Sequence, residues 1–374
     1  MMSLKQIFLG LLILIGLFAC KNDEAQSTPS DFYVALPSPP VKMVNTSGTW
    51  LVYEMHIKTP SVQKVDISNA ENELLTYTDF NSSEDMHLAS IWLPFPENGW
   101  NVSQLNHRFT YLDAMGNEKE FDFNLTLPSD FPDPITIQFP VPHGVWIAEG
   151  APGANSYHTR ALFSYPEPIF DEDQNGYLFG NNPQRYAIDY ALLIDGLPYE
   201  NDGTQLSDWH CYNLPILAAE GGTVVFTRSD IPDNQTPGEL DYETGIDNAT
   251  GNVVYIKHPD GSIGTYCHMV PNSVLVEVGD EVTTGQEIGR LGNSGNSFGP
   301  HLHMHVLTNP ENQSITEYSD GFFMESLPYR FADFTKLGAL PPGYLDESPL
   351  VPFVPTMSES CQHQLPSESD VIEF

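Results

Sequence analysis

Basic side chains are scarce in this sequence. Its 374 residues include 14 Lys and Arg against 50 Asp and Glu, which gives a formal net charge of -36. A surface with this charge repels nucleic acids, because their binding depends on Lys and Arg contacts to phosphates. We therefore expect no nucleic-acid partner. The acidity itself is typical of a well-solvated surface and identifies no ligand.

Cysteine is rare as well, and the complete set is Cys20, Cys211, Cys267 and Cys361. Their spacing contains no C-x-x-C pair and no zinc-knuckle pattern, so we expect the chemistry to depend on other side chains. The three cysteines after Cys20 permit at most one internal disulfide, among Cys211, Cys267 and Cys361.

Apolar residues with helical spacing are hard to find after the first twenty positions. The 28 Gly and 31 Pro separate short runs of alternating apolar and polar residues, which favours strands joined by many loops. We therefore predict a mostly β protein with little helix. A chain of 374 residues is long enough for two domains, each with its own core.

The first twenty residues, MMSLKQIFLGLLILIGLFAC, predict export from the cytoplasm. A lone Lys5 precedes an apolar run over residues 7–18, which is too short for a comfortable membrane span. Residues 17–20, Leu-Phe-Ala-Cys, resemble the lipobox of bacterial lipoproteins, and residues 20–24, CKNDE, resemble a surface-export signal of such proteins. The resemblance implies a signal peptide over residues 1–19, lipidation at Cys20, and an outer-membrane lipoprotein that meets the membrane through its lipid anchor only. A plain secretory signal that ends in Cys is the alternative.

Turn and proline signals divide the rest of the chain. We expect a tether over residues 20–31, a β-sandwich-like domain over residues 32–138, a second β domain over residues 139–340 and a C-terminal tail over residues 341–374. Short alternating runs such as TWLVYEMHI and EFDFNLTL support the first domain. The segment PSDFPDPITIQFPVP marks the boundary, because proline interrupts strand pairing.

Three histidines stand at alternate positions in GNSGNSFGPHLHMHV, residues 292–306. Side chains alternate between the two faces of a strand, so His301, His303 and His305 project together while the intervening apolar residues face a core. Imidazole is the commonest metal ligand, and convergent histidines beside a glycine-rich turn favour a metal site. An exposed polar strand face is the alternative interpretation.

A series of segments in the second half of the chain carries a family resemblance. They are AAEGGTVV (218–225), GNVVYI (251–256), YCHM (266–269) and VGDEVTTGQEIGRLGNSGNSFGPHLH (278–303). In this order they resemble the lysostaphin or LytM-type zinc metallopeptidases, which cut peptidoglycan cross-bridges. The resemblance implies a mostly antiparallel β peptidase domain, similar to the duplicated hybrid motif, after the β-sandwich.

The resemblance also implies roles for individual residues. Asp189, in QRYAIDYAL, matches the aspartate ligand of zinc, and His303 matches the second histidine of the H-x-H ligand motif. His301 and His268 match the two histidines that act beside the metal. His301 is the better candidate for the base, because it stands two residues from a ligand on the same face.

The chain departs from the family at position 185, where the first zinc ligand should be His and the sequence has Arg185. Arginine stays protonated and cannot bind a metal. His158, in GANSYHTR, is our first candidate for the replacement ligand, and His305 is the second. The other interpretation is a metal-poor site in a non-catalytic relative.

A second metal signal is DEDQNG, residues 171–176, which begins like a calcium-binding loop with Asp171, Asp173 and Asn175 as ligands. Its twelfth position is Asn182 instead of Glu, and short motifs of this kind also arise in acidic loops. Calcium is therefore one of two interpretations of this segment.

Together these features predict a zinc-dependent metalloendopeptidase, anchored in the bacterial cell envelope, that hydrolyses peptide cross-links in peptidoglycan. Its partners would be the stem and cross-bridge peptides of the cell wall. The alternative is a catalytically degenerate domain that binds peptidoglycan or regulates another cell-wall hydrolase. Metal content separates the two, because the enzyme should hold about one zinc per chain.

Overall fold

The computed structural model describes residues 32–96, 99, 102–245, 247–308, 324–341, 344–346 and 349–374. Nearly all of its regular structure is β, and the described helices are two short 3-10 turns, η3 (Leu206–Asp208) and η4 (Tyr344–Asp346). The prediction of a mostly β fold with little helix is confirmed. Within the described ranges, no helix has the length and apolar character needed to cross a membrane. The signal peptide, Cys20 and the tether predicted above lie outside the described residues.

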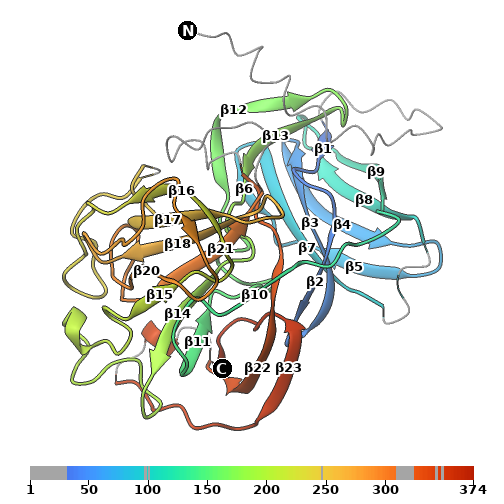
Figure 1. Ribbon diagram of the computed structural model, residues 1–374. Coiled ribbons are helices and arrows are strands. Elements are labelled where there is room, and N and C mark those ends of the chain that lie inside the picture. The colour runs from blue at the N-terminus through green and yellow to red at the C-terminus, as the bar shows by residue number, and fades with distance from the viewer. Residues whose placement is uncertain are drawn as a thin grey trace.

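The N-terminal half contains two antiparallel sheets (Figure 1). The five-stranded sheet has the order β1-β3-β7-β6, with β2 also paired to β3; its strands are β1 (Tyr33–Ala35), β2 (Val41–Asn45), β3 (Gly48–Lys58), β6 (Asn81–Ser83) and β7 (Met86–Pro94). The four-stranded sheet has the order β5-β4-β8-β9; its strands are β4 (Ser61–Ser68), β5 (Glu73–Tyr77), β8 (Gln104–Leu112) and β9 (Glu118–Thr126).

Strand alternation explains how these two sheets pack. On β3, Tyr53 and Met55 belong to an apolar cluster to which β4, β7 and β8 also contribute, so the two sheets form a β-sandwich. The alternating residues Val52, Glu54 and His56 point to the opposite face of the sheet and are buried too. The outer face of β3 is therefore covered by another part of the molecule.

The second half is built on an eleven-stranded sheet. Its order is β10-β22-β24-β11-β14-β21-β18-β17-β16-β19, with β23 also paired to β22. The strands are β10 (Ile135–Ile137), β11 (Val145–Glu149), β14 (Ile188–Leu193), β16 (Gly222–Arg228), β17 (Asn252–Lys257), β18 (Ile263–Met269), β19 (Glu281–Val282), β21 (Leu302–Leu307), β22 (Tyr329–Ala339), β23 (Glu359–Gln364) and β24 (Asp370–Glu373). Two hairpins accompany it: β12 (Phe163–Asp171) with β13 (Gly176–Asn181), and β15 (Pro215–Leu217) with β20 (Glu287–Arg290).

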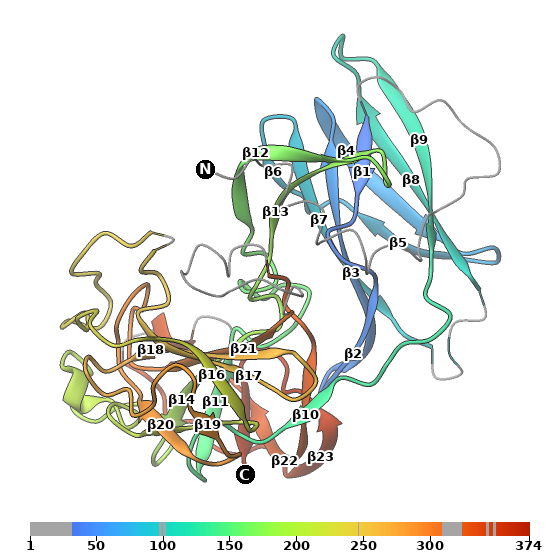
Figure 2. The same cartoon turned by 45° about the horizontal axis from the view of Figure 1, so that its top comes forward.

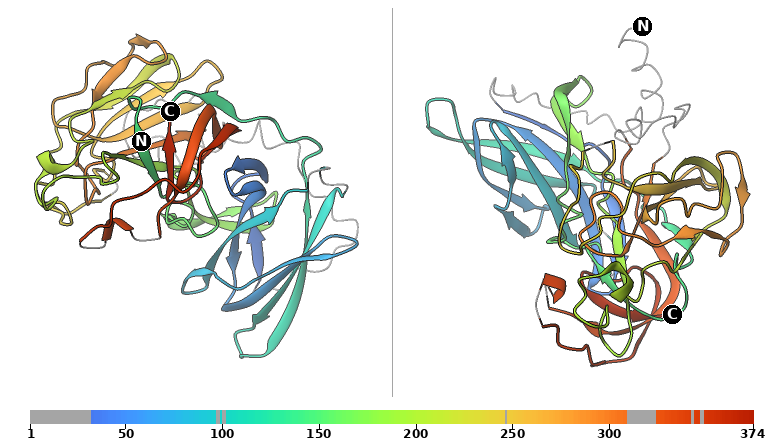
Figure 3. Two further views of the ribbon diagram at one scale, coloured as in Figure 1. Left: turned by 90° about the horizontal axis from the view of Figure 1, so that it is seen from below. Right: turned by 90° about the vertical axis from the view of Figure 1, so that its left-hand side faces the viewer.

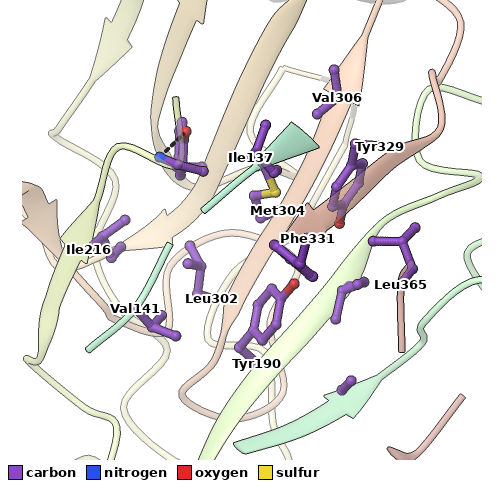
Figure 4. Packing of buried hydrophobic residues seen from close by; sticks show 14 of the residues in the cluster. Ile137, Val141, Tyr190, Ile216, Leu302, Met304, Val306, Tyr329, Phe331 and Leu365 are labelled. Atoms are coloured by element: carbon purple, nitrogen blue, oxygen red, sulfur yellow. Dashed lines mark hydrogen bonds between the residues drawn. The ribbon is translucent and has the colours of Figure 1, made fainter. Parts of the chain in front are cut away.

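One face of this sheet carries the main core. Leu302, Met304 and Val306 of β21 are fully buried in it beside Tyr190 of β14 and Phe331 of β22 (Figure 4). These three apolar residues are the ones that alternate with His301, His303 and His305. Their burial fixes the register of β21, because a slip by one residue would exchange the apolar and the histidine faces.

The two halves pack against each other through the covered face of β3. Met43, Val52 and Trp92 of the N-terminal sheet belong to the same apolar cluster as Tyr190 and Leu302. The β12–β13 hairpin extends from the second half and lies against β1 and β3 (Figures 2 and 3). The sandwich is thus docked on the domain that carries the histidines.

The segment expected as a C-terminal tail contributes two strands to the large sheet. β24 lies between β22 and β11, and β23 pairs with β22. Val371 and Ile372 of β24 are fully buried, but a strand of four residues is too short to stand out in the sequence. Cys211, Cys267 and Cys361 are all free and buried, so none of them forms a disulfide in this structure.

Candidate metal centre

The pairing of two neighbouring strands brings Asp189 and His303 together. β14 and β21 are antiparallel, and Asp189 stands directly opposite His303. Residues opposite each other on one face of a sheet have neighbouring side chains. The Nδ1 atom of His303 accordingly lies 2.8 Å from the Oδ1 atom of Asp189. Both side chains are buried.

His158 completes the group from outside the sheet. It lies in a turn that follows β11, and its Nε2 atom is 3.4 Å from the Oδ2 atom of Asp189. One donor atom from each of His158, Asp189 and His303 lies within 4.8 Å of the other two. Among the residues that the structure describes, this is the group of His, Cys, Asp and Glu arranged to hold a metal ion.

The protonation pattern of this group fits a bound cation. The Nδ1 atom of His158 lies 2.8 Å from the carbonyl oxygen of Gly150, so Nδ1 carries the proton and Nε2 directs a lone pair at the Asp189 carboxylate. Two lone pairs 3.4 Å apart repel unless a cation lies between them. Ligand atoms of a tetrahedral zinc are about 3.3 Å apart for bonds of about 2.0–2.1 Å. The donor set is of a type that zinc accepts, and the separation of His158 Nε2 and Asp189 Oδ2 is close to that of two zinc ligands.

Burial and neighbouring charge determine the ionisation of these ligands. Burial alone would raise the pKa of Asp189, but the surrounding His158, His301 and His303 hold it well below its usual range. Burial lowers the pKa of His158 to about 4. At neutral pH the site thus presents an ionised carboxylate and a neutral imidazole, which are the forms that bind metal.

His301 lies beside this group, and one of its ring nitrogens already forms a hydrogen bond. Its Nδ1 atom is 2.8 Å from the carbonyl oxygen of Gly299, and its Nε2 atom is 3.6 Å from Oδ1 of Asp189. Nδ1 therefore carries the proton, and Nε2 turns a lone pair toward the candidate metal centre.

A β-bulge aims His268 at the same place. Between the pairs Asn252–Met269 and Val254–Tyr266, two residues of β18 stand opposite one residue of β17. His268 occupies this bulge with a φ of 60°, a conformation that a side chain adopts only at a cost of about 1 kcal/mol or more. Its ring centre lies 4.8 Å from that of His301, and its Nδ1 atom donates to the carbonyl oxygen of Ser294 at 2.7 Å.

His305, our second candidate for the replacement ligand, lies one step further along the strand. Its Nδ1 atom is 2.9 Å from the Nε2 atom of His303. In this position it can accept the proton of His303 Nε2 and so fix the tautomer in which Nδ1 of His303 faces Asp189. The structure groups His158, and not His305, with Asp189 and His303.

The glycine-rich turn before the histidine strand is closely packed. A Cβ atom on Gly292 would lie 2.5 Å from the backbone nitrogen of Val270. At Gly295, φ is +82° and a Cβ atom would lie 2.3 Å from the backbone nitrogen of Gly251. No other residue fits either position, so the turn can bring β21 to the floor of the site only with glycine.

Arg185 points away from the metal group. Its guanidinium lies 3.2 Å from a carboxylate oxygen of Glu54 and 3.1 Å from one of Glu325. Arg185 is almost fully buried, so these two carboxylates replace the water that its charge has lost. The residue at the expected ligand position therefore holds an ion pair with β3 of the sandwich.

The calcium prediction gains no support. Asp171 accepts hydrogen bonds from the backbone nitrogens of Asp173 and Gln174, at 3.0 and 3.1 Å, and one from the Gln174 side chain. Asn175 has a φ of 50° and takes part in the turn between β12 and β13. The DEDQNG segment is thus a hairpin turn whose first carboxylate is satisfied by the turn itself.

Tyr157 was not identified from the sequence as part of the site. The residue is 50% exposed, yet its hydroxyl donates a hydrogen bond of 2.6 Å to Oδ2 of Asp189. The signal available in the sequence was its position next to His158, because the same turn delivers both side chains.

Comparison with known proteins identifies a family to which part of this chain is similar. Residues 207–315, less than a third of the chain, match the model of peptidase family M23. These residues, here called the M23 region, are similar to that family. The M23 region contains His268, His301 and His303, whereas His158 and Asp189 precede it.

Several curated proteins are similar to part of this chain. The peptidoglycan DD-endopeptidase ShyC of Vibrio cholerae is 34% identical over 101 residues, which are 24% of this chain and 23% of the relative. The peptidoglycan DD-endopeptidase ShyA of the same organism is 40% identical over 93 residues, 25% of this chain and 17% of the relative. The matches thus span less than a quarter of each relative. Among solved structures, the catalytic domain of lysostaphin from Staphylococcus simulans is 25% identical, with a TM-score of 0.21, over 39% of this chain and 78% of that one.

Proposed function

We propose that this protein is a zinc metalloendopeptidase that hydrolyses peptide cross-links in peptidoglycan. The proposal includes His158, Asp189 and His303 as zinc ligands, and His301 and His268 as catalytic residues. It also includes anchoring in the cell envelope through a lipid on Cys20, and the division into a sandwich, expected over residues 32–138, and a peptidase domain, expected over residues 139–340, whose sheet also takes in β10, β23 and β24.

The observation that carries the proposal is the convergence of one buried carboxylate and two imidazoles, each with a donor atom within 4.8 Å of the other two. A purely structural cluster would pair hydrogen-bond donors with acceptors. In the His158–Asp189 pair, acceptor faces acceptor, and a cation removes that conflict.

The chain supplies binding and proton transfer around this centre. His158, Asp189 and His303 would hold the zinc, which when bound would supply a Lewis acid that activates water and polarises the carbonyl of a peptide bond. His301 presents the unprotonated Nε2 atom described above, so it can accept the proton of the attacking water. The imidazolium formed in this way is then a donor for the leaving amine.

His268 lies on the other side of His301 and has the same protonation pattern. Its Nδ1 proton is held by Ser294, so the unprotonated Nε2 atom is available to the reaction. Burial lowers the pKa of His268 well below its ordinary value, so the ring stays neutral. Its Nε2 atom can then accept a hydrogen bond from the attacking water and orient it, while His301 takes the proton.

Peptidoglycan is proposed as the substrate because two of the similar proteins are named as peptidoglycan DD-endopeptidases. The lipobox-like residues 17–20 support an envelope location for such an enzyme, where its substrate is. A lipid on Cys20 would anchor the protein to the membrane without a spanning segment.

Metal content and cleavage test the proposal together. Purified full-length protein should contain about one zinc per chain and release peptides from isolated peptidoglycan, whereas His303→Ala should lose both properties. His143→Ala is the matched control, since His143 is an exposed histidine on the same domain. Wild-type protein that binds no zinc and cuts nothing would contradict the proposal and favour the non-catalytic relative. Zinc binding without cleavage would contradict the choice of substrate.

A further inference from the structure

A buried ion cluster joins the sandwich to the peptidase domain next to the candidate metal centre. Glu54 and His56 of β3 are fully buried, and the Nε2 atom of His56 lies 3.0 Å from Oε1 of Glu54. The other oxygen of Glu54, Oε2, pairs with Arg185 at 3.2 Å. Glu325 lies on the far side of the same guanidinium at 3.1 Å. Breaking a charged pair this deeply buried is costly, because removal of one partner leaves the other charge without water.

Glu54 is the stronger anion of the two that face Arg185. Burial alone would raise the pKa of Glu54, but Arg185 and His56 lower it below its ordinary value. Burial raises the pKa of Glu325 above its ordinary value, even though Arg185 opposes this. Near neutral pH, Glu54 is therefore the partner that is fully ionised, and it comes from the sandwich.

Hydrogen bonds connect the turn that contains Arg185 to the turn that contains His158. The side-chain nitrogen of Asn182 donates to the carbonyl oxygens of His158 and Thr159, each at 2.9 Å. The Oγ1 atom of Thr159 in return donates to the carbonyl oxygen of Arg185 at 3.3 Å. All four residues are buried, so these backbone contacts have no competing water.

We propose that Glu54, a residue of the N-terminal sandwich, is a positioning residue for the metal ligand His158 and acts through Arg185 and its turn. This inference rests on the proposed function, because it takes His158 to be a zinc ligand. It gives the sandwich a role in the chemistry of the other domain. Arg185 stands where the family pattern has the first zinc ligand. It then supports His158, the residue that takes over this ligand role.

The expected loss of zinc affinity can be estimated from how little the zinc–ligand distances can vary. Zinc–ligand distances vary by about 0.2 Å, so a shift of a few tenths of an ångström in the His158 turn weakens binding. Removal of groups that orient a ligand typically lowers metal affinity by about 10–100-fold. Since Glu54 acts through one further residue, we expect a loss of about tenfold, equivalent to about 1.4 kcal/mol.

Three variants of the full-length protein test the inference. Glu54→Gln keeps the shape of the side chain but removes its charge. Thr159→Val also keeps its shape and removes the hydrogen bond to Arg185 while leaving the ion cluster intact. Gln174→Ala is the matched control, because Gln174 makes hydrogen bonds of 2.8 and 3.0 Å to Leu36 across the same domain interface, without a link to the His158 turn. For each variant, zinc affinity is measured by competition with a chelator, and Tm is measured with and without zinc.

A positioning role predicts a specific pattern. Glu54→Gln and Thr159→Val should each lose about tenfold in zinc affinity and show a smaller zinc-induced rise in Tm, whereas Gln174→Ala should match the wild type in both. A structural role alone would lower Tm in the absence of zinc and leave the zinc affinity unchanged. That result in Glu54→Gln and Thr159→Val would overturn the inference while the proposed function stands. A wild-type protein that binds no zinc would overturn both.

Discussion

Gly150 offers the sharpest test of how the candidate metal centre is built. It precedes the His158 turn, and its carbonyl oxygen accepts the Nδ1 proton of His158 at 2.8 Å. Its φ is +59°, a conformation that favours glycine. A Cβ atom at this position would lie 2.5 Å from Nδ1 of His158 and 2.6 Å from Cζ of Tyr157. Gly150→Ala therefore strains the backbone and displaces the ligand at the same time.

The two effects of Gly150→Ala have different sizes. The left-handed conformation costs an alanine about 1–2 kcal/mol, which lowers the free energy of unfolding by that amount. The contact must also lengthen from 2.5 Å to an ordinary distance of about 3.5 Å, so His158 has to move by about 1 Å. This is several times the tolerance of a zinc–ligand bond, and we expect a loss of about 100-fold in zinc affinity.

Chelator competition and urea unfolding measure these two quantities separately. Gly153→Ala is the control, because it lies in the same loop, has no positive φ, and the nearest atom to its added Cβ would be 3.9 Å away. It should keep the affinity and the stability of the wild type. If Gly150→Ala folds and binds zinc as tightly as Gly153→Ala, then His158 is not a ligand or the Gly150 contact does not orient it.

Two further predictions concern proton transfer and pH. His301→Ala should lower kcat for peptidoglycan cleavage by about 10²–10⁴-fold while the protein still retains zinc, and equal losses of zinc and activity would contradict its role as the base. In the sandwich core, burial lowers the pKa of His107 to about 4, whereas the unfolded chain takes up this proton near pH 6.5. The free energy of unfolding should therefore fall by about 3 kcal/mol as the pH drops from 6.5 to 4. Urea titrations of His107→Leu should lack this part of the fall, and an unchanged pH profile would show that His107 is not the cause.

A local pattern predicted the strand that carries the histidines, whereas Asp189 was implied by the family resemblance. The alternation of His301, His303 and His305 with apolar residues predicts a strand with one apolar face in a core, and β21 has its apolar residues in the main core, although its histidine face is buried as well. The glycine-rich segment before this strand predicts a turn, and Gly295 has the positive φ that such a turn can use. These features depend on the periodicity of a strand and on the missing side chain of glycine, which act within a few residues.

Contacts between distant segments could not be predicted in the same way. Glu54 stands in an apolar strand 131 positions before Arg185, and nothing in the spacing of either residue indicates an ion pair. The place of β24 inside the large sheet depends on pairing with β11 and β22, more than 30 residues away in each case. Such pairings are decided by the packing of whole sheets, to which a short segment adds little periodic signal.

The candidate ligand His158 lies in a turn and not on the strand that carries Asp189. Its position therefore needs more contacts to fix it than a position on that strand would need. In the family pattern, the first ligand stands four residues before the aspartate, close to the strand that fixes both. Here His158 reaches the same carboxylate from a separate turn, so its position depends on Gly150 and on contacts with the Arg185 turn. If His158 is a zinc ligand, Arg185 and its ion pair with the sandwich help to hold the turn that carries this ligand. The consequence is testable in a single double-mutant cycle: Glu54→Gln and Gly150→Ala should be non-additive in zinc affinity, because both act on His158.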